Sequence, residues 1–415
     1  MKSDWKLLTL GDVTTWSSGG TPKKDNPEYW NGDIPWISAN SMHSTRLGAS
    51  DIKITQLGLD AGSRLAESGS VLLLVRGGAL HNRIPVGIAT RDVAFNQDVK
   101  SLKAKIEFIT PWYLLFWLMA HERFLLSSVV EYTGIGAGKL DTRRMQSLPF
   151  WVPPPNQLSA IESFAKSLDD RIALLRETNA TLEAIAQALF KSWFVDFDPV
   201  HARARGEQPA GLPPEVAALF PDSFEESALG MIPRGWKLMQ FGEFIDRQSV
   251  GKKYDQKSAL EEGSVPILDQ GKSGVIGFHN NKPSVCASLV SPVVVFANHT
   301  CYMRLITFDF SAIQNVLPFI GKGVDTVWAF YATKDRVKFS EYKGHWPEFV
   351  IQKTIVPNQE LTEIFRNMVD PLICSMRNNE LQAQTLANLR DTLLPRLISG
   401  QLRLPEAEAM VEGAS

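Results

Sequence analysis

The pattern of apolar and polar positions predicts two long amphipathic helices that repeat one another. Apolar residues recur every three or four positions through residues 152–197 and again through residues 356–402, which is the spacing of a helix that buries one face. About 40 residues at roughly 1.5 Å each give a rod of about 60 Å. Neither copy can bury its stripe alone, so we expect the two helices to pack on each other. The seam is expected to include Leu168, Ile172, Leu182 and Leu189 of the first copy and Leu372, Met376, Leu386 and Leu393 of the second.

Two interpretations of this repeat are open. Periodicity alone favours core helices of two unrelated domains. The matched segments PPPNQ (residues 153–157) and VPNQ (residues 356–359) in front of the copies favour a paired spine. In such a spine, Asn179 and Asn379 lie on or beside the seam and fix its register.

The helices follow two globular segments that begin alike, with Trp5-Lys6-Leu7 and Trp236-Lys237-Leu238. Each segment contains short strand-like runs broken by Gly, Pro, Asn and Ser, which predicts a mixed α/β (α+β) fold. The predicted organisation is a first domain in residues 1–152, a helix in 153–197, an acidic Pro-rich connector in 198–232, a second domain in 233–355, a helix in 356–404 and a disordered tail in 405–415. The connector is expected to be partly ordered through Val216, Leu219, Phe220 and Phe224.

Composition narrows the class of protein. A chain of 415 residues exceeds one ordinary core, so two or more domains are expected. The longest apolar run, residues 111–120, is too short to span a bilayer, and no signal-like segment precedes Trp5. Three scattered cysteines argue against disulfides and zinc. A cytoplasmic location is expected.

The net charge of −2 hides an uneven distribution. Residues 1–155 hold 17 Lys and Arg against 14 Asp and Glu, and residues 233–356 hold 15 against 11. The positive charge therefore lies in the two globular segments, where it permits contact with phosphates.

Motifs for catalysis fail when their required residues are checked. Gln270-Gly271-Lys272-Ser273 ends like a phosphate-binding loop, but Pro266 stands where the first glycine is needed. Pro221-Asp222 lacks the carboxylate-x-lysine of a metal-dependent nuclease. No Asn/Asp-Pro-Pro-aromatic segment of an adenine methyltransferase is found, and the seven histidines lack paired ligand spacing. We therefore predict no catalytic residue, metal site or cofactor in this chain.

Polar loops of both domains carry the residue types that contact DNA phosphates and base edges. Cations and side-chain amides stand beside small residues in these loops, although a solvated turn explains any single one. The DNA-binding candidates of the first domain are Ser18, Gly19, Gly20, Thr21, Lys23, Lys24, Arg76, His81, Arg83, Asn96, Gln97 and Lys139. Those of the second domain are Lys252, Lys253, Tyr254, Gln270, Lys272, Ser273, Asn298, His299, Lys343 and His345.

Three segments carry a resemblance to a known family. They are LFKSWFVDFDPVHARARG (residues 189–206) running into GLPPEVAALFPDSFEESALGMIPRGWKL (residues 211–238), the terminal LANLRDTLLPRLISGQLRLP (residues 386–405), and FNQDV (residues 95–99). In these segments the chain resembles the specificity subunit of type I restriction–modification systems. The resemblance extends from Trp5 to about Leu404.

The resemblance implies a non-catalytic subunit with two target recognition domains, each reading one half of a split sequence in double-stranded DNA. It implies two modification subunits and restriction (motor) subunits as partners, and no membrane. S-adenosylmethionine, ATP and Mg would be held by those partners. The expected arrangement is pseudo-two-fold, with an antiparallel spine and half-sites roughly 10 base pairs apart.

The second domain departs from the family pattern, because Ala312-Ile313-Gln314-Asn315 stands where FNQDV is expected. Individual DNA contacts are therefore not transferred to it. Two other hypotheses stay open, a protein–protein interaction scaffold built on the duplicated helices and a nuclease with an unrecognised site. The lysine-, arginine- and amide-bearing loops favour the DNA-reading hypothesis over the scaffold.

Overall fold

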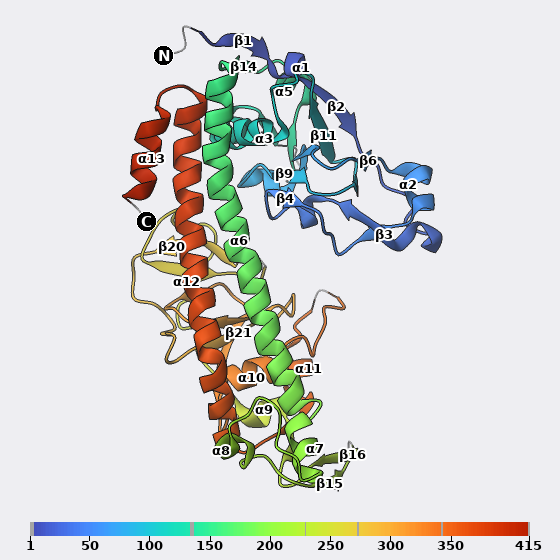
Figure 1. Cartoon of the computed structure of the whole chain (residues 1–415), viewed down its shortest axis with the longest axis vertical. Coiled ribbons are helices and arrows are strands. Elements are labelled where there is room, and N and C mark those ends of the chain that lie inside the picture. The colour runs from blue at the N-terminus through green and yellow to red at the C-terminus, as the bar shows by residue number, and fades with distance from the viewer. Residues whose placement is uncertain (1–3, 133–136, 229, 272–273, 342, 414–415) are drawn as a thin grey trace. The chain divides into compact units, whose positions relative to one another are not determined.

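The computed structural model describes residues 4–132, 137–228, 230–271, 274–341 and 343–413. The chain divides into two compact units (Figure 1): unit 1 is Met1–Leu175 with Gln382–Ser415, and unit 2 is Arg176–Leu381. Each unit contains one globular segment and part of each of two long helices, α6 (Pro155–Phe194) and α12 (Gln359–Ile398). The mixed α/β class with two long helices, predicted from the sequence, is confirmed.

In the described residues of unit 1, the globular part has four sheets and short helices. Its core surrounds α3 (Pro111–Ala120), whose residues from Tyr113 to Leu118 are all buried. This is the apolar run that was too short to span a bilayer, and it is a core helix. The elements are β1 (Lys6–Thr9), α1 (Leu10–Val13), β2 (Thr14–Ser18), β3 (Trp30–Ile37), β4 (Arg46–Leu47), β5 (Lys53–Ile54), α2 (Gln56–Gly62), β6 (Leu65–Ala66), β7 (Val71–Leu74), β8 (Arg76–Gly77), β9 (Val86–Ala89), β10 (Val93–Phe95), β11 (Val99–Ala104), α3 (Pro111–Ala120), α4 (Glu122–Ser128), β12 (Val130–Tyr132), β13 (Gly138–Leu140), α5 (Thr142–Gln146) and β14 (Pro149–Val152). The sheet orders are β2-β11-β7-β9-β4, β5-β3-β10-β6, β12-β13-β8 and β1-β14.

Unit 2 is built in a similar way around α10 (Thr326–Thr333), which is buried along its whole length after its first residue. The elements are α7 (Asp198–Ala204), α8 (Pro214–Ala217), β15 (Phe224–Ser227), β16 (Gly230–Pro233), β17 (Lys237–Gln240), α9 (Phe241–Phe244), β18 (Ile245–Arg247), β19 (Val265–Leu268), β20 (Val275–His279), β21 (Val293–Ala297), β22 (Met303–Ile306), β23 (Ser311–Ala312), β24 (Val316–Gly321), α10 (Thr326–Thr333), α11 (Trp346–Val350) and β25 (Lys353–Val356). The sheet orders are β18-β24-β21-β22, β20-β19-β23, β17-β25 and β15-β16.

The two units have two strand pairings in common. In unit 1, β1 pairs antiparallel with β14, and Lys6 lies opposite Val152. In unit 2, β17 pairs with β25 in the same way, and Lys237 lies opposite Val356. A short parallel pair also occurs in each unit, β3 with β10 and β19 with β23. The similar openings seen in the sequence therefore begin two similarly connected folds.

The helices α6 and α12 have the same length and begin and end with an offset of 204 residues. In unit 1, Ile172 of α6 packs with Ala383 and Leu386 of α12. In unit 2, the rings of Phe190 and Phe365 are 5.6 Å apart. The helices thus pack against each other within each unit, as their stripes predict.

Both asparagines of the predicted seam are hydrogen-bonded within unit 2. Asn379 Nδ2 donates to Asn179 Oδ1 at 2.8 Å, and Asn179 Nδ2 donates to the carbonyl of Met376 at 2.9 Å. This polar contact fixes the local register of the two helices. Of the predicted seam residues, Leu168, Ile172 and Leu393 are buried, and Leu182, Leu189, Leu372, Met376 and Leu386 are half-buried.

The connector and the C-terminal segment are ordered by apolar anchors. Phe220 of the connector is buried in the core of unit 2. The prediction of a disordered tail in residues 405–415 is wrong for its larger part, because Leu404–Glu412 form helix α13. Pro405 stands in the first turn of α13, where a missing amide hydrogen costs nothing. Ala407 is fully buried in the core of unit 1, and this burial stabilises the helix.

Candidate nucleic-acid interface

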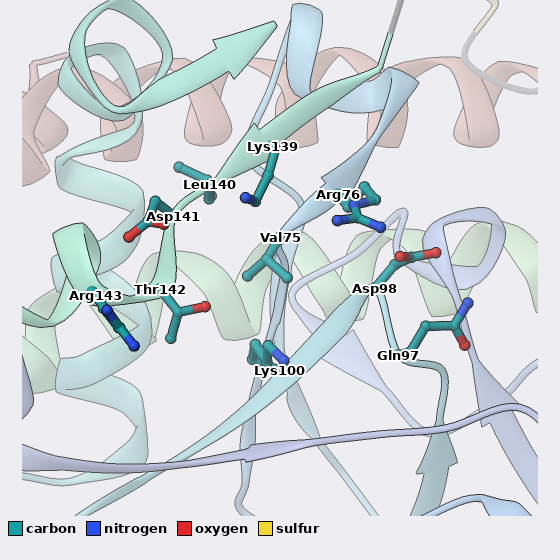
Figure 2. Close-up of a pocket in the computed structure, with 10 residues that line it drawn as sticks. All are labelled: Val75, Arg76, Gln97, Asp98, Lys100, Lys139, Leu140, Asp141, Thr142 and Arg143. Atoms are coloured by element: carbon teal, nitrogen blue, oxygen red, sulfur yellow. The ribbon is translucent and has the colours of Figure 1, made fainter. Parts of the chain in front are cut away.

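The polar cavity of unit 1 lies where three backbone segments are hydrogen-bonded side by side. The amide of Val75 donates to the carbonyl of Asp98 at 2.8 Å, and the amide of Leu140 donates to the carbonyl of Val75 at 2.9 Å. These bonds bring the turn after β10 next to the β8–β13 pair. The cavity has a volume of about 530 Å³. Figure 2 shows the residues that line it, which we call site 1: Val75, Arg76, Gln97, Asp98, Lys100, Lys139, Leu140, Asp141, Thr142 and Arg143.

Four cationic side chains line site 1. Arg76 and Lys139 lie opposite each other in the antiparallel β8–β13 pair, Lys100 follows on β11, and Arg143 lies on α5. Burial lowers the pKa of Lys100, and the neighbouring Arg76 adds to this effect. Within the described part of the chain, Arg76, Lys139 and Arg143 form no salt bridge. Their charges are therefore available to an anionic ligand.

One of the two carboxylates of site 1 has a structural role. Asp141 is the N-cap of α5 and accepts a hydrogen bond from the amide of Arg144 at 2.9 Å. This bond is the main cause that holds the pKa of Asp141 below its usual value. The cap fixes the start of α5 and so presents Arg143 to the cavity.

Two hydrogen bonds attach the end of β2 and the loop after it to site 1. Thr21 Oγ1 donates to Gln97 Oε1 at 2.5 Å, and Lys100 Nζ donates to Ser18 Oγ at 2.5 Å. The candidates Ser18, Thr21, Arg76, Gln97 and Lys139, which are far apart in the sequence, are thereby brought together.

The two glycines of this loop serve close packing. A Cβ atom on Gly19 would lie 2.1 Å from the carbonyl oxygen of Phe95, and one on Gly20 would lie 2.1 Å from that of Gly62. The amide of Gly20 donates to the carbonyl of Phe95 at 2.9 Å. It is therefore already hydrogen-bonded within the protein.

Other candidates of unit 1 lie outside the cavity. Asn96 is buried and accepts a hydrogen bond from the amide of Asp98 at 3.2 Å. Arg83 Nη2 donates to the carbonyl of Met42 at 2.9 Å, and burial lowers the pKa of this arginine. His81 stacks on Tyr132 with ring centres 4.8 Å apart. Lys23 and Lys24 are exposed in the turn that follows the β2 loop.

Unit 2 repeats the backbone connections of site 1. The amide of Asn298 donates to the carbonyl of Asn315 at 2.9 Å, and the amide of His345 donates to the carbonyl of Asn298 at 2.9 Å. By this match, His299 corresponds to Arg76. We define site 2 by the residues at or beside positions that match site 1: His299, Gln314, Leu317, Lys343 and Pro347.

Three candidates of unit 2 hold the backbone around site 2. Gln270 Oε1 accepts a hydrogen bond from the amide of His299 at 2.9 Å, and Asn298 Oδ1 accepts one from the amide of Trp346 at 2.8 Å. His345 is fully buried, and its Nδ1 lies 3.1 Å from Glu348 Oε2. These side chains are occupied within the protein.

The remaining candidates of unit 2 divide into buried and exposed residues. Tyr254 is buried and stacks on His279 with ring centres 4.1 Å apart. Lys252 and Lys253 are exposed, and Lys252 Nζ lies 5.1 Å from the centre of the Tyr254 ring. Lys272 and Ser273, which were also predicted to contact DNA, lie outside the described residues.

Three residues of site 1 and site 2 were not predicted from the sequence. Lys100 and Arg143 line site 1, and exposed Gln314 occupies the position in unit 2 that corresponds to Gln97. A signal for Lys100 was present, because it directly follows FNQDV. The signal for Gln314 was the glutamine at the third position of AIQNV, residues 312–316.

The described residues contain neither a metal-binding cluster nor a membrane-spanning helix. Throughout the described ranges, no group of three or more His, Cys, Asp and Glu residues is placed to hold a metal ion. Likewise, no helix in the described part of the chain combines the length and apolar character needed to span a membrane.

Comparison with known proteins shows which family the chain resembles. Residues 2–184 match the family model described as "Type I restriction modification DNA specificity domain". The resemblance predicted from the sequence is thereby confirmed, and it continues beyond this domain in whole-chain relatives.

The type I restriction enzyme MjaIX specificity subunit of Methanocaldococcus jannaschii is 22% identical over 97% of this chain and 94% of its own length. The EcoR124I/EcoR124II specificity subunit of Escherichia coli is 27% identical over 40% of this chain and 41% of its own length. Among solved structures, the S subunit of a type I restriction–modification system from M. genitalium covers 95% of this chain and 96% of its own, with 14% identity and a TM-score of 0.47.

Proposed function

We propose that this chain is the non-catalytic specificity subunit of a type I restriction–modification complex. It would read a bipartite sequence in double-stranded DNA, one half with residues 1–152 and the other with residues 233–355. The observation that carries the proposal is site 1, a cavity lined by Arg76, Lys100, Lys139 and Arg143 within the segment that matches the specificity-domain family.

The chemistry of site 1 suits DNA. Forked or multiple donors such as Arg76 and Lys139 match the O6 and N7 acceptors of guanine, and a side-chain amide such as that of Gln97 matches adenine. Lys100 and Arg143 supply charge for backbone phosphates, whose neutralisation releases counterions and dominates affinity. Exposed Lys23, Lys24, Lys252 and Lys253 extend this role to the flanking loops.

The partners follow from the same proposal. Two modification subunits would dock on the paired helices α6 and α12 and supply the S-adenosylmethionine chemistry. Restriction (motor) subunits, with ATP and Mg, would complete the assembly in the cytoplasm. The chain itself would contribute sequence reading and assembly.

The test is to co-express the chain with its modification subunit and to map N6-methyladenine by long-read sequencing. The expected result is methylation of one split motif with a fixed spacer. Unmodified DNA from cells in which the two subunits form a stable complex would contradict DNA reading and would favour the scaffold hypothesis. A control with Arg76→Ala, Lys100→Ala and Lys139→Ala should still assemble but should methylate the motif less completely.

A further inference from the structure

Gln97 and Gln314 occupy the same place in the two units. Gln97 lies in the turn between β10 and β11, and Gln314 lies in the turn between β23 and β24. In unit 1 the turn is entered by a hydrogen bond from the amide of Asn96 to the carbonyl of Ile37 at 3.0 Å. In unit 2 the equivalent bond runs from Ile313 to Leu268 at 3.1 Å.

The end of each turn is fixed in the same way. The amide of Val75 donates to the carbonyl of Asp98 at 2.8 Å, and that of Asn298 donates to the carbonyl of Asn315 at 2.9 Å. Both glutamine side chains are exposed. The two units thus present a side-chain amide on the same backbone scaffold.

The side chains around the two glutamines differ. Gln97 is next to Arg76 and Lys100 in the lining of site 1. In unit 2, His299 and buried Leu317 take the matching positions. Residues that differ between site 1 and site 2 are expected to contact bases that differ between the two half-sites. A residue that both sites have in common is expected to contact a base that both half-sites have in common.

The chemistry of the amide identifies that feature. A glutamine amide offers one acceptor and one donor, and adenine presents N6 as donor and N7 as acceptor on its major-groove edge. Thr21 Oγ1 donates to Gln97 Oε1 at 2.5 Å, which orients the amide. The Nε2 atom of Gln97 donates to no other described residue, so it is available for a base.

We propose that Gln97 and Gln314 read the same base, an adenine, in the two halves of the target. The inference rests on the proposed DNA-reading function and deepens it, since it assigns one specificity-determining residue to each half-site. Thr21 is a positioning residue for Gln97.

The experiment uses the complex with the modification subunit and duplexes of the mapped target in which each base pair is replaced in turn. Gln97→Ala should reduce discrimination at one A·T pair of the first half-site by about 5- to 100-fold and leave the second half-site unchanged. Gln314→Ala should do the same in the second half-site only. Gln208→Ala, an exposed glutamine of the connector, is the matched control and should change neither.

Two further variants separate base reading from other roles. Thr21→Val keeps the side-chain shape and removes the hydroxyl, so it should weaken discrimination at the Gln97 base pair alone. Gln97→Glu should shift the preference at that pair towards cytosine, since a carboxylate accepts from its N4.

The outcomes are distinct. An affinity loss that is equal for all duplexes would assign the glutamines to phosphate contact and overturn the inference. Unchanged discrimination in both variants, with normal target binding by the unmodified complex, would also overturn it and leave the proposed function intact. Failure of the unmodified complex to prefer any split target would instead remove the proposed function.

Discussion

Site 1 and site 2 share a backbone and differ in charge. Arg76 of site 1 is replaced by His299, Lys100 by buried Leu317 and Arg143 by Pro347. The first two matches follow from the hydrogen bonds between backbone segments that the two units share. The third follows from α5 and α11, which have the same length and each lead into the strand that pairs with the first strand of the domain.

The remaining cation of site 2 is already neutralised. Lys343, which lies next to the position matching Lys139, has its Nζ atom 2.7 Å from Glu348 and 3.0 Å from Glu341. The two glutamates raise the pKa of Lys343, and Lys343 lowers that of Glu348. Unit 1 is therefore expected to contribute more of the salt-dependent DNA affinity than unit 2. The backbone that the two sites share does not depend on which side chains it carries.

The helix seam shows a second difference between the units. In unit 1, buried Asp169 of α6 lies 2.7 Å from Arg390 of α12 and accepts hydrogen bonds from Thr45 at 2.9 and 3.0 Å. At the offset of 204 residues, the matching positions of unit 2 hold Ile373 and Ala186, both buried. At these two matched positions, unit 1 has a buried ion pair and unit 2 has apolar residues.

The largest predicted effect comes from breaking that ion pair. Arg390→Ala leaves the Asp169 carboxylate buried without its closest cation and should cost about 3 kcal/mol of stability. Replacing both residues by their unit 2 counterparts, Asp169→Ile with Arg390→Ala, should restore most of the loss, because well-packed apolar residues often replace buried ion pairs at little cost. Denaturant unfolding of the single and double variants measures both. A double variant as unstable as the single one would show that the seam of unit 1 requires its charges.

The next effect concerns DNA affinity. Lys100→Ala and Arg143→Ala together should make the plot of log affinity against log salt shallower by about 2, because each phosphate contact contributes roughly 0.9. Lys343→Ala in unit 2 should change the slope by less than about 1, since its charge is already paired. Titrations of the assembled complex with its target at several salt concentrations provide the measurement. Equal changes from the two variants would refute the asymmetry between the sites.

A smaller effect is expected from the exposed loops. Lys23→Ala with Lys24→Ala, and Lys252→Ala with Lys253→Ala, remove two cations each from turns of unit 1 and unit 2. Each pair should reduce the salt slope by at most about 2 without changing base preference, since phosphate contacts carry no sequence information. The same titrations apply. If substitution of both lysines of a loop leaves the DNA affinity and the salt slope unchanged, that loop does not contact DNA.

The sequence predicted the helices well because their signal is local. The bounds of α6 and α12 repeat at an offset of 204 residues, as the two apolar stripes do. Asn179 and Asn379 could also be placed on the seam, since helical periodicity alone assigns positions to a face.

Site 1 could be predicted only in part because it depends on long-range pairing. The bonds from Val75 to Asp98 and from Leu140 to Val75 join segments that no local pattern relates. Asn96 and Tyr254 were expected to contact DNA, and both are buried, since residue type alone cannot distinguish a base-reading amide or ring from a packed one. The helix α13 was missed for a similar reason, because its stability depends on burial of Ala407 against residues far away in the chain.

The smallest predicted effect is an acid sensitivity of unit 2. Among the described residues, the buried histidines, His279 and His345, both lie in unit 2. Burial is the main cause that lowers the pKa of His279, and nearby Lys252 adds to it. Its Nδ1 accepts a hydrogen bond from the amide of Asn281 at 3.1 Å, which requires that atom to be unprotonated.

The pKa of His279 is lower in the folded chain than its value of about 6.5 in the unfolded chain. At pH values between these two pKa values, the unfolded chain binds more protons than the folded chain. The stability that unprotonated His279 contributes to the fold is therefore fully present above about pH 6.5 and is lost as the pH falls through the folded pKa. The loss should be comparable to one hydrogen bond, about 1 kcal/mol. His279→Phe keeps a ring beside Tyr254 and should flatten the dependence of unit 2 stability on pH. Amide hydrogen exchange between pH 7.5 and 5 resolves the two units, and an equal response of unit 1 would show that His279 is not the cause.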